Sequence, residues 1–263
     1  MLFQSCEVLN EPGEIEFNNS ILFNLKTGNV PQQLFVYNTY PLSYSFSDSP
    51  PFINPDEAFT ENAKITVTDG KNIYHKFQLS FTDTITKSRC YTNTEELFIY
   101  PNKEYSIQVE SNGRLINGKI ITIGDFEISG IKKVECGDKD RLYFDVTWDN
   151  CPGAKYYKLI SNYFYMDFAI VGSIDGEFVW DFVNINRLNS FYLNVDTLTV
   201  VNNKISSEVS ISPKSDSLIV YVEAYDLNSY NHYFKGIKKV GIENAYGYIG
   251  SSTVKSIKII FKK

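Results

Sequence analysis

Hydrophobic and polar residues alternate most clearly between Arg141 and Trp148, near the middle of the chain. Apolar residues occupy every second position of this stretch, namely Leu142, Phe144, Val146 and Trp148. A period of two is typical of a β-strand with one buried face, because successive side chains of a strand point to opposite sides of the sheet. The pattern therefore predicts a half-buried strand with Trp148 on its inner face.

Two further strands are predicted on either side of this one. Residues 131–134 precede it across the polar turn 137–140, and residues 155–160 follow it after the break at 149–153. A tryptophan near the end of a strand, then a Pro-Gly turn and a Tyr-rich strand, resembles the opening of a fibronectin type III domain. The resemblance implies a β-sandwich over residues 125–263.

The first part of the chain has the same kind of patterning. Residues 33–46 alternate, and Asp69-Gly70 is a hairpin signal, because glycine accepts the positive φ that a type I′ turn requires. We therefore predict an all-β fold with two tandem β-sandwich domains, of immunoglobulin or fibronectin III type. The first covers 14–124, and the second covers 125–263 with an insertion at 162–205.

One helix is predicted in this all-β chain, close to its C-terminus. It covers Asp226 to Lys239 and follows a strong strand pattern from Ser217 to Tyr225. Gly236 weakens the end of this helix, since glycine is a poor helix former.

Composition limits the chemistry of the chain. Aromatic residues make up 15% of it, with 19 Tyr and 19 Phe, and both types favour strands. The net charge is −6 without a cluster of Lys or Arg, so nucleic acid is not an expected partner. His75 and His232 are the two histidines, which argues against a multi-His metal site and most His-based triads. We expect no cofactor, no metal and no enzymatic activity.

The first residues read Met1-Leu2-Phe3-Gln4-Ser5-Cys6-Glu7. An apolar pair, a small residue and then cysteine resembles the lipobox of bacterial lipoproteins, which implies a thiol acylated at Cys6. Residues 1–13 would then be a lipobox remnant and a tether to the membrane, since several acyl chains give a durable anchor. The alternative is an ordinary cysteine near the N-terminus.

Cys136 and Cys151 are expected not to form a disulfide. They lie beyond opposite ends of the predicted strand 141–148, which at about 3.3 Å per residue separates them by roughly 20 Å or more. A disulfide requires Cα atoms within roughly 7 Å of one another.

Aromatic residues concentrate around the predicted insertion and form the candidate contact surface. In a strand only alternate members of such a run are buried in one core, so the others face solvent or a partner. Tyrosine and tryptophan bring contact area and a polar tip, which suits carbohydrate, peptide or protein. The alternative is that these rings are core residues. The candidate binding residues are Tyr163, Phe164, Tyr165, Phe168 and Trp180.

Three segments resemble an uncharacterised family of outer-membrane lipoproteins of Bacteroidota, a domain of unknown function. They are residues 102–107, the Cys-Pro-Gly-Ala-Lys-Tyr-Tyr stretch 151–157, and the Asn-rich and Gly-rich stretch 243–250. The resemblance implies a lipid-anchored protein of the outer membrane that works beside a TonB-dependent transporter. It carries no catalytic residues over to this chain.

The leading hypothesis is a non-enzymatic surface or periplasmic lipoprotein that binds ligand or partner for a TonB-dependent transporter. A structural or adhesive surface lipoprotein without a small ligand is the alternative. A carboxylate-based glycosidase is third, and it would need two carboxyl groups about 5 to 9 Å apart across a cleft.

Overall fold

The computed structural model describes residues 19–38, 59–71, 74–81, 89–135, 138–174 and 177–261. Strands account for 66% of the structure and helices for 5%, so the predicted all-β class is confirmed. Among the described residues, no helix is long and apolar enough to cross a membrane. Cys6 and the tether 1–13 lie outside the described part of the chain.

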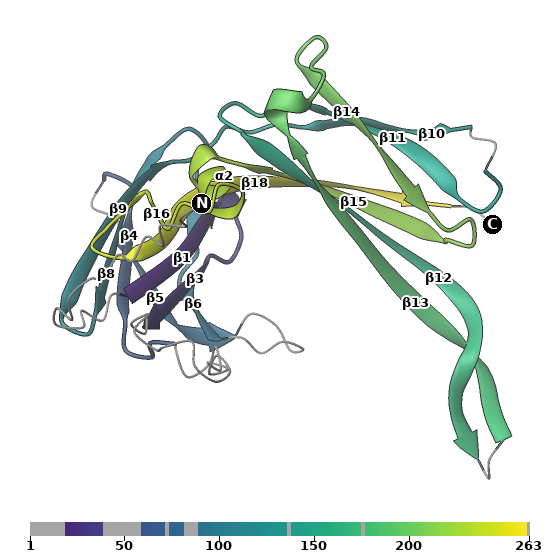
Figure 1. The fold of residues 1–263 in the computed structure, drawn as a ribbon, viewed down its shortest axis with the longest axis horizontal. Coiled ribbons are helices and arrows are strands. Elements are labelled where there is room, and N and C mark those ends of the chain that lie inside the picture. The colour runs from purple at the N-terminus through teal and green to yellow at the C-terminus, as the bar shows by residue number, and fades with distance from the viewer. Residues whose placement is uncertain are drawn as a thin grey trace, which may run out of the picture.

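The strands follow one another along almost the whole described chain (Figure 1). In the first half they are β1 Asn19–Lys26, β2 Gly28–Asn29, β3 Gln33–Asn38, β4 Lys64–Thr68, β5 Tyr74–Phe81, β6 Arg89–Asn93, β7 Phe98–Ile99, β8 Glu104–Ser111 and β9 Arg114–Ile121. In the second half they are β10 Ile128–Val134, β11 Leu142–Asp149, β12 Tyr156–Ile174, β13 Glu177–Asn194, β14 Lys204–Ile211, β15 Ser217–Tyr225, β16 Lys239–Val240, β17 Ile242–Glu243 and β18 Tyr246–Ile260. A 3₁₀ turn, η1 Val195–Thr197, and one helix, α2 Leu227–Tyr233, complete the fold.

Thirteen strands form one sheet that runs through the molecule, in the order β13-β12-β15-β18-β1-β3-β6-β5-β4-β8-β9-β17, with β16 beside β18. Strand β5 turns the corner of this sheet. Its first residues pair with β4 and its last residues pair with β6, so the sheet folds back on itself. Two smaller sheets, β10-β11-β14 and β2-β7, lie apart from it.

The first hydrophobic core lies between the two arms of the folded sheet. It holds residues such as Ile21, Phe23, Val67, Tyr105 and Ile107, each at most 1% exposed. Three residues from the C-terminal part of the chain belong to the same core, namely Ile242, Ala245 and Ile249. We call the strands around this core the first lobe.

The second core lies between the sheet β10-β11-β14 and the face of β12, β15 and β18. The predicted alternation of 141–148 is realised in β11, because Phe144, Val146 and Trp148 are buried whereas Asp145 is exposed. Trp148 is 0% exposed and packs edge-on against the ring of Tyr157, at 5.5 Å between ring centroids. Two layers around one core make a β-sandwich, which we call the second lobe.

Strand β18 belongs to both lobes (Figure 1). Residues Tyr246–Ser252 pair in parallel with Ser20–Lys26 of β1, and residues Ser252–Ile260 pair antiparallel with β15. The division into domains 14–124 and 125–263 stays a prediction. Within it, Ile242, Ala245 and Ile249 are assigned to the second domain by sequence order but pack in the first core. Alternation identifies a strand without identifying the sheet that receives it.

The predicted helix is confirmed in α2, although it is shorter than the sequence pattern indicates. Asp226 is its N-cap, and the side chain accepts a hydrogen bond from the backbone N–H of Ser229 at 2.8 Å. The same carboxylate accepts from the N–H of Ser251 on β18, at 3.0 Å. The helix ends at Tyr233, and Gly236 beyond it has a φ of +64°. Asp226 therefore fixes α2 to the strand that joins the lobes.

The stability of the fold is expected to depend on the ionisation of Asp226. Burial raises the pKa of this carboxyl above its ordinary value of 3.8, since the backbone donors offset only part of the cost of desolvation. The folded state then holds the proton more tightly than the unfolded chain. This contribution is complete below pH 3.8 and is lost as the pH rises through the raised folded pKa.

The non-titrating variant Asp226→Asn isolates this effect. Urea unfolding of both proteins at a series of pH values should show the wild-type free energy of unfolding falling relative to the variant's as the pH rises through that window. A difference that stays constant with pH, or rises, would contradict the assignment.

Cys151 forms no disulfide, as predicted. Its thiol is 2% exposed and donates to the carbonyl oxygen of Gly124 at 3.2 Å, and burial raises its pKa to about 12. The thiol thus packs as a small apolar group where the lobes meet. Cys136 lies outside the described residues.

Candidate functional site

The structure describes the side chains of three of the five residues of the predicted aromatic surface. Tyr163 is half-buried against the second core, and its ring stacks on Tyr165 with centroids 6.3 Å apart. Phe164 pairs with Ser217 of β15, at the end of that pairing. Phe168 and Trp180 lie further along β12 and β13, where their side chains fall outside the described part. The described rings of this run do not form one surface.

These residues belong to a two-stranded ribbon. Strands β12 and β13 pair along their whole length, from Tyr156–Asn194 to Ile174–Glu177, whereas β15 pairs only with Tyr156–Phe164. Beyond Phe164 the two strands project from the second lobe (Figure 1). Strand β13 is also the last strand of the large sheet. The predicted insertion is therefore a ribbon with a free edge among the described strands.

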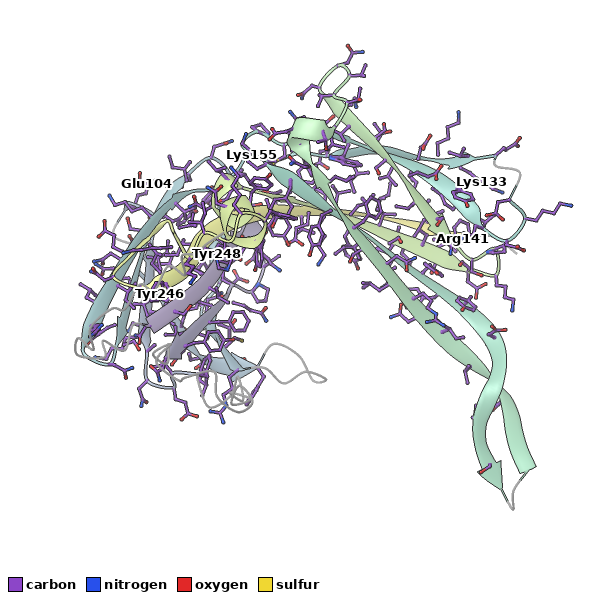
Figure 2. All side chains as sticks on the ribbon, in the orientation of Figure 1. Glu104, Lys133, Arg141, Lys155, Tyr246 and Tyr248 are labelled. Atoms are coloured by element: carbon purple, nitrogen blue, oxygen red, sulfur yellow. The ribbon has the colours of Figure 1, made fainter. Side chains whose placement is uncertain are left out.

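A second group of aromatic side chains lies on the face of the large sheet that points away from the second core, where the two lobes meet. Tyr157 and Leu159 of β12 point into the second core, so Tyr156 and Lys158 point away from it. On β15 the alternation likewise places Tyr225 on this outer face. Helix α2 lies over the same region and adds its own rings, and Figure 2 shows Tyr248 of β18 near the helix.

The rings on this face are in close contact with one another. Tyr156 and Tyr225 stack face to face, with centroids 4.6 Å apart and planes within 1° of parallel. Phe234 meets Tyr156 edge-on at 4.9 Å, and Tyr192 meets Phe234 at 5.6 Å. Next to them, the hydroxyl oxygens of Tyr233 and Tyr248 are 3.0 Å apart. The buried rings of Tyr156 and Tyr248 thus hold the exposed rings of Tyr192, Tyr233 and Phe234 in fixed orientations.

Two adjoining hollows open between these rings, and we call them together the aromatic groove. One, of about 380 Å³, is lined by Tyr156, Lys158, Tyr192, Tyr225, Tyr233 and Phe234. The other, of about 320 Å³, shares Lys158, Tyr225 and Tyr233 and adds Leu22, Asn24, Lys26, Gln33, Phe35, Glu223 and Tyr248. The first lobe supplies the residues of β1 and β3, so both lobes build the groove.

Polar groups form one part of the groove. Glu223 is 8% exposed and accepts a hydrogen bond from Ser252 Oγ at 3.3 Å, and Ser252 Oγ accepts one from Asn24 Nδ2 at 2.8 Å. The ammonium group of Lys158 lies 5.6 Å from the centre of the Tyr192 ring. Burial and the neighbouring carboxylate of Glu223 raise the pKa of Tyr225, so this tyrosine stays neutral. The groove thus combines one carboxylate, two lysines and several tyrosines.

Sequence reasoning did not find this groove. Its residues come from β1, β3, β12, β13, β15, α2 and β18, which are scattered from Leu22 to Tyr248. Two local signals are present in the sequence, the Tyr-Tyr pair 156–157 and the aromatic residues of 227–234. Neither indicates that β1 pairs with β18, which brings the two lobes together at this face.

The groove offers a carboxylate and amides but no described metal site. Within the residues that the structure describes, no group of three His, Cys, Asp or Glu side chains could hold a metal ion. His232 stacks on Tyr248 with centroids 4.6 Å apart, so its ring extends the aromatic wall.

Comparisons with known proteins do not identify a family. A scan of protein-family models and a search of curated proteins gave no match. Among solved structures, a mutant of Salmonella alpha-2-macroglobulin has 10% identity and a TM-score of 0.25, covering 96% of this chain and 15% of that one. The methylamine-reacted form of that protein has 10% identity and a TM-score of 0.23, covering 95% and 17%.

A third structure combines manganese lipoxygenase of Gaeumannomyces graminis and zonadhesin of Komagataella pastoris. It has 8% identity and a TM-score of 0.19, covering 93% of this chain and 99% of that one. The chain spans less than a fifth of the length of the Salmonella protein. Likeness at these TM-scores carries no argument about this chain.

Proposed function

We propose that this chain is a non-enzymatic lipoprotein of the outer membrane that binds a ligand for a TonB-dependent transporter. The ligand lies in the aromatic groove, acylated Cys6 holds the protein at the membrane, and the transporter is the partner. The membrane anchor and the transporter rest on the sequence resemblance. The ligand rests on the groove.

The groove itself is the observation that carries the binding function. It is a concave site with exposed rings and a few polar groups, which is the usual make-up of small-ligand sites. Tyr192 and Tyr233 are 54% and 58% exposed, and each contacts a neighbouring aromatic ring. Large aromatic side chains held at the surface favour contact with a ligand or partner.

Binding without chemistry fits the described lining better than hydrolysis. A glycosidase of the usual kind needs a pair of carboxyl groups on either side of the scissile bond. Glu223 is the single carboxylate among the described residues that line the groove. The alternation on β15 and the pairing of β15 with β18 fix this residue on the floor of the groove.

Co-purification from the native outer membrane tests the transporter role. Tagged protein extracted in mild detergent should bring a TonB-dependent transporter with it, and mass spectrometry should find a diacylglyceryl group on Cys6. The variant Cys6→Ala is the matched control: it should leave the membrane fraction and no longer recover the transporter. An unmodified Cys6 thiol, or extraction without any transporter, would contradict the proposal.

The β12–β13 ribbon favours an adhesive or structural surface lipoprotein as the second candidate. Strand β13 is 18 residues long and ends the sheet, so its outer edge can pair with a strand of another protein. In that case, recovery of a different surface protein through the ribbon would replace the transporter in the same experiment.

A further inference from the structure

We infer that the ligand of the aromatic groove is a carbohydrate, an inference that rests on the proposed binding function. Sugars have hydroxyl groups that both donate and accept hydrogen bonds, and their C–H faces pack against aromatic rings.

The groove has acceptors and donors close together. Glu223 is an acceptor with capacity left, because a carboxylate has about four lone-pair positions and Ser252 Oγ occupies one of them. The Tyr225 hydroxyl also bonds to this carboxylate. Lys26 and Lys158 line the same hollow and are donors only. A ligand that contacts both kinds of group must carry donors and acceptors, as a polyhydroxylated ring does.

The rings provide the apolar part of the site. Tyr192, Tyr233 and Phe234 are each between 48% and 58% exposed, and each has its edge or face fixed by another ring. A sugar that stacks on such a ring removes apolar surface of both partners from water. Because the rings are already held in place, little side-chain entropy is lost on binding.

Other classes of ligand fit the groove less well. A cationic amine would suit the tyrosines and Glu223, but Lys26 and Lys158 in the same hollow repel it. An anion such as a phosphate would meet Glu223 on the floor. Each of these classes leaves a like charge facing it, whereas a neutral polyol does not.

A peptide bound as an added strand is disfavoured for a different reason. Strands β12, β15, β18 and β1 form the floor of the groove, and each is paired on both sides in the large sheet. The floor of the groove therefore offers no backbone edge for strand addition, which is how extended peptides gain much of their affinity. Strand β13, whose outer edge is free, contributes Tyr192 alone to the described lining.

Glycan and peptide binding by the full chain, in detergent, test the inference. Fluorescently labelled protein is applied to an array of plant, microbial and animal glycans and to an array of tripeptides. Glycans that bind are then titrated by calorimetry against the variants Tyr233→Ala, Tyr192→Ala and Glu223→Gln. Tyr100→Ala is the matched control, since Tyr100 is 52% exposed and lies outside the groove.

The expected result is binding of at least one glycan, weakened about tenfold or more in each groove variant and unchanged in Tyr100→Ala. Circular dichroism confirms that each variant is folded. Binding of tripeptides alone, with the same dependence on the groove, would overturn the carbohydrate assignment and leave the binding function intact. Glycan binding that all three groove variants retain, or no groove-dependent binding of any glycan, would overturn the inference.

Discussion

Replacing Gly247 by alanine is expected to destabilise both lobes together, by about 3–5 kcal/mol. Gly247 has a φ of +100°, a conformation that L-residues rarely adopt, and an added Cβ would overlap the backbone carbonyl of Ile21 on β1. The backbone of β1 cannot move away without breaking its parallel pairing with β18. Thermal unfolding followed by circular dichroism measures the effect, and a fall in Tm of about 10 °C is expected.

The control for this substitution is Gly130→Ala. Gly130 lies in β10, its φ is ordinary, and a Cβ built there meets nothing within 4 Å. Alanine at this position should leave the Tm unchanged within a few degrees, or raise it, because glycine loses more chain entropy on folding. Equal effects of the two substitutions would show that the contact between β18 and β1 is not what joins the lobes.

Local patterns of the sequence predict the class of the fold well, because they report directly on which residues face a core. The alternation of β11 and the helix that is predicted after Ser217–Tyr225 are both found in the structure. Local patterns do not indicate which strands pair with one another. Ile242 and Ile249 pack in the first core through pairing with strands more than 100 residues away. Nothing within their own segment encodes that partner.

Local patterns also fail to predict the candidate site. The run Tyr163–Trp180 is dense in aromatic residues, so it was an obvious candidate, but its described rings lie on different faces of the ribbon or against the core. The aromatic groove depends instead on isolated residues such as Tyr192, Tyr225 and Tyr248. Tyr192 and Tyr225 become neighbours through the pairing of β12 with β13 and with β15, and the pairing of β18 with β15 and β1 adds Tyr248 and the residues of the first lobe. A site assembled by tertiary pairing leaves little trace in local composition.

Replacing Trp148 by alanine is expected to lower the free energy of unfolding by about 3–5 kcal/mol, because the variant loses the burial of the largest side chain in the second core and leaves a cavity. Trp148 is 0% exposed and contacts the ring of Tyr157, so the surrounding sandwich can collapse only partly. Urea unfolding measures the loss, with Leu188→Ala as the surface control, since Leu188 is 62% exposed and should cost less than about 0.5 kcal/mol.

The number of unfolding transitions of Trp148→Ala in urea shows whether the two lobes unfold together or separately. Strand β18 donates residues to both cores, with Ile249 in the first and Ile257 and Ile259 against the second. If the second lobe of Trp148→Ala unfolds, residues Ser252–Ile260 of β18 lose their partner β15. The segment Tyr246–Ser252, which pairs with β1, is then no longer continued by a paired strand. We therefore expect one cooperative transition at lower urea. Two separated transitions, with the first lobe at its wild-type midpoint, would mean that the lobes fold independently in spite of the strand they share.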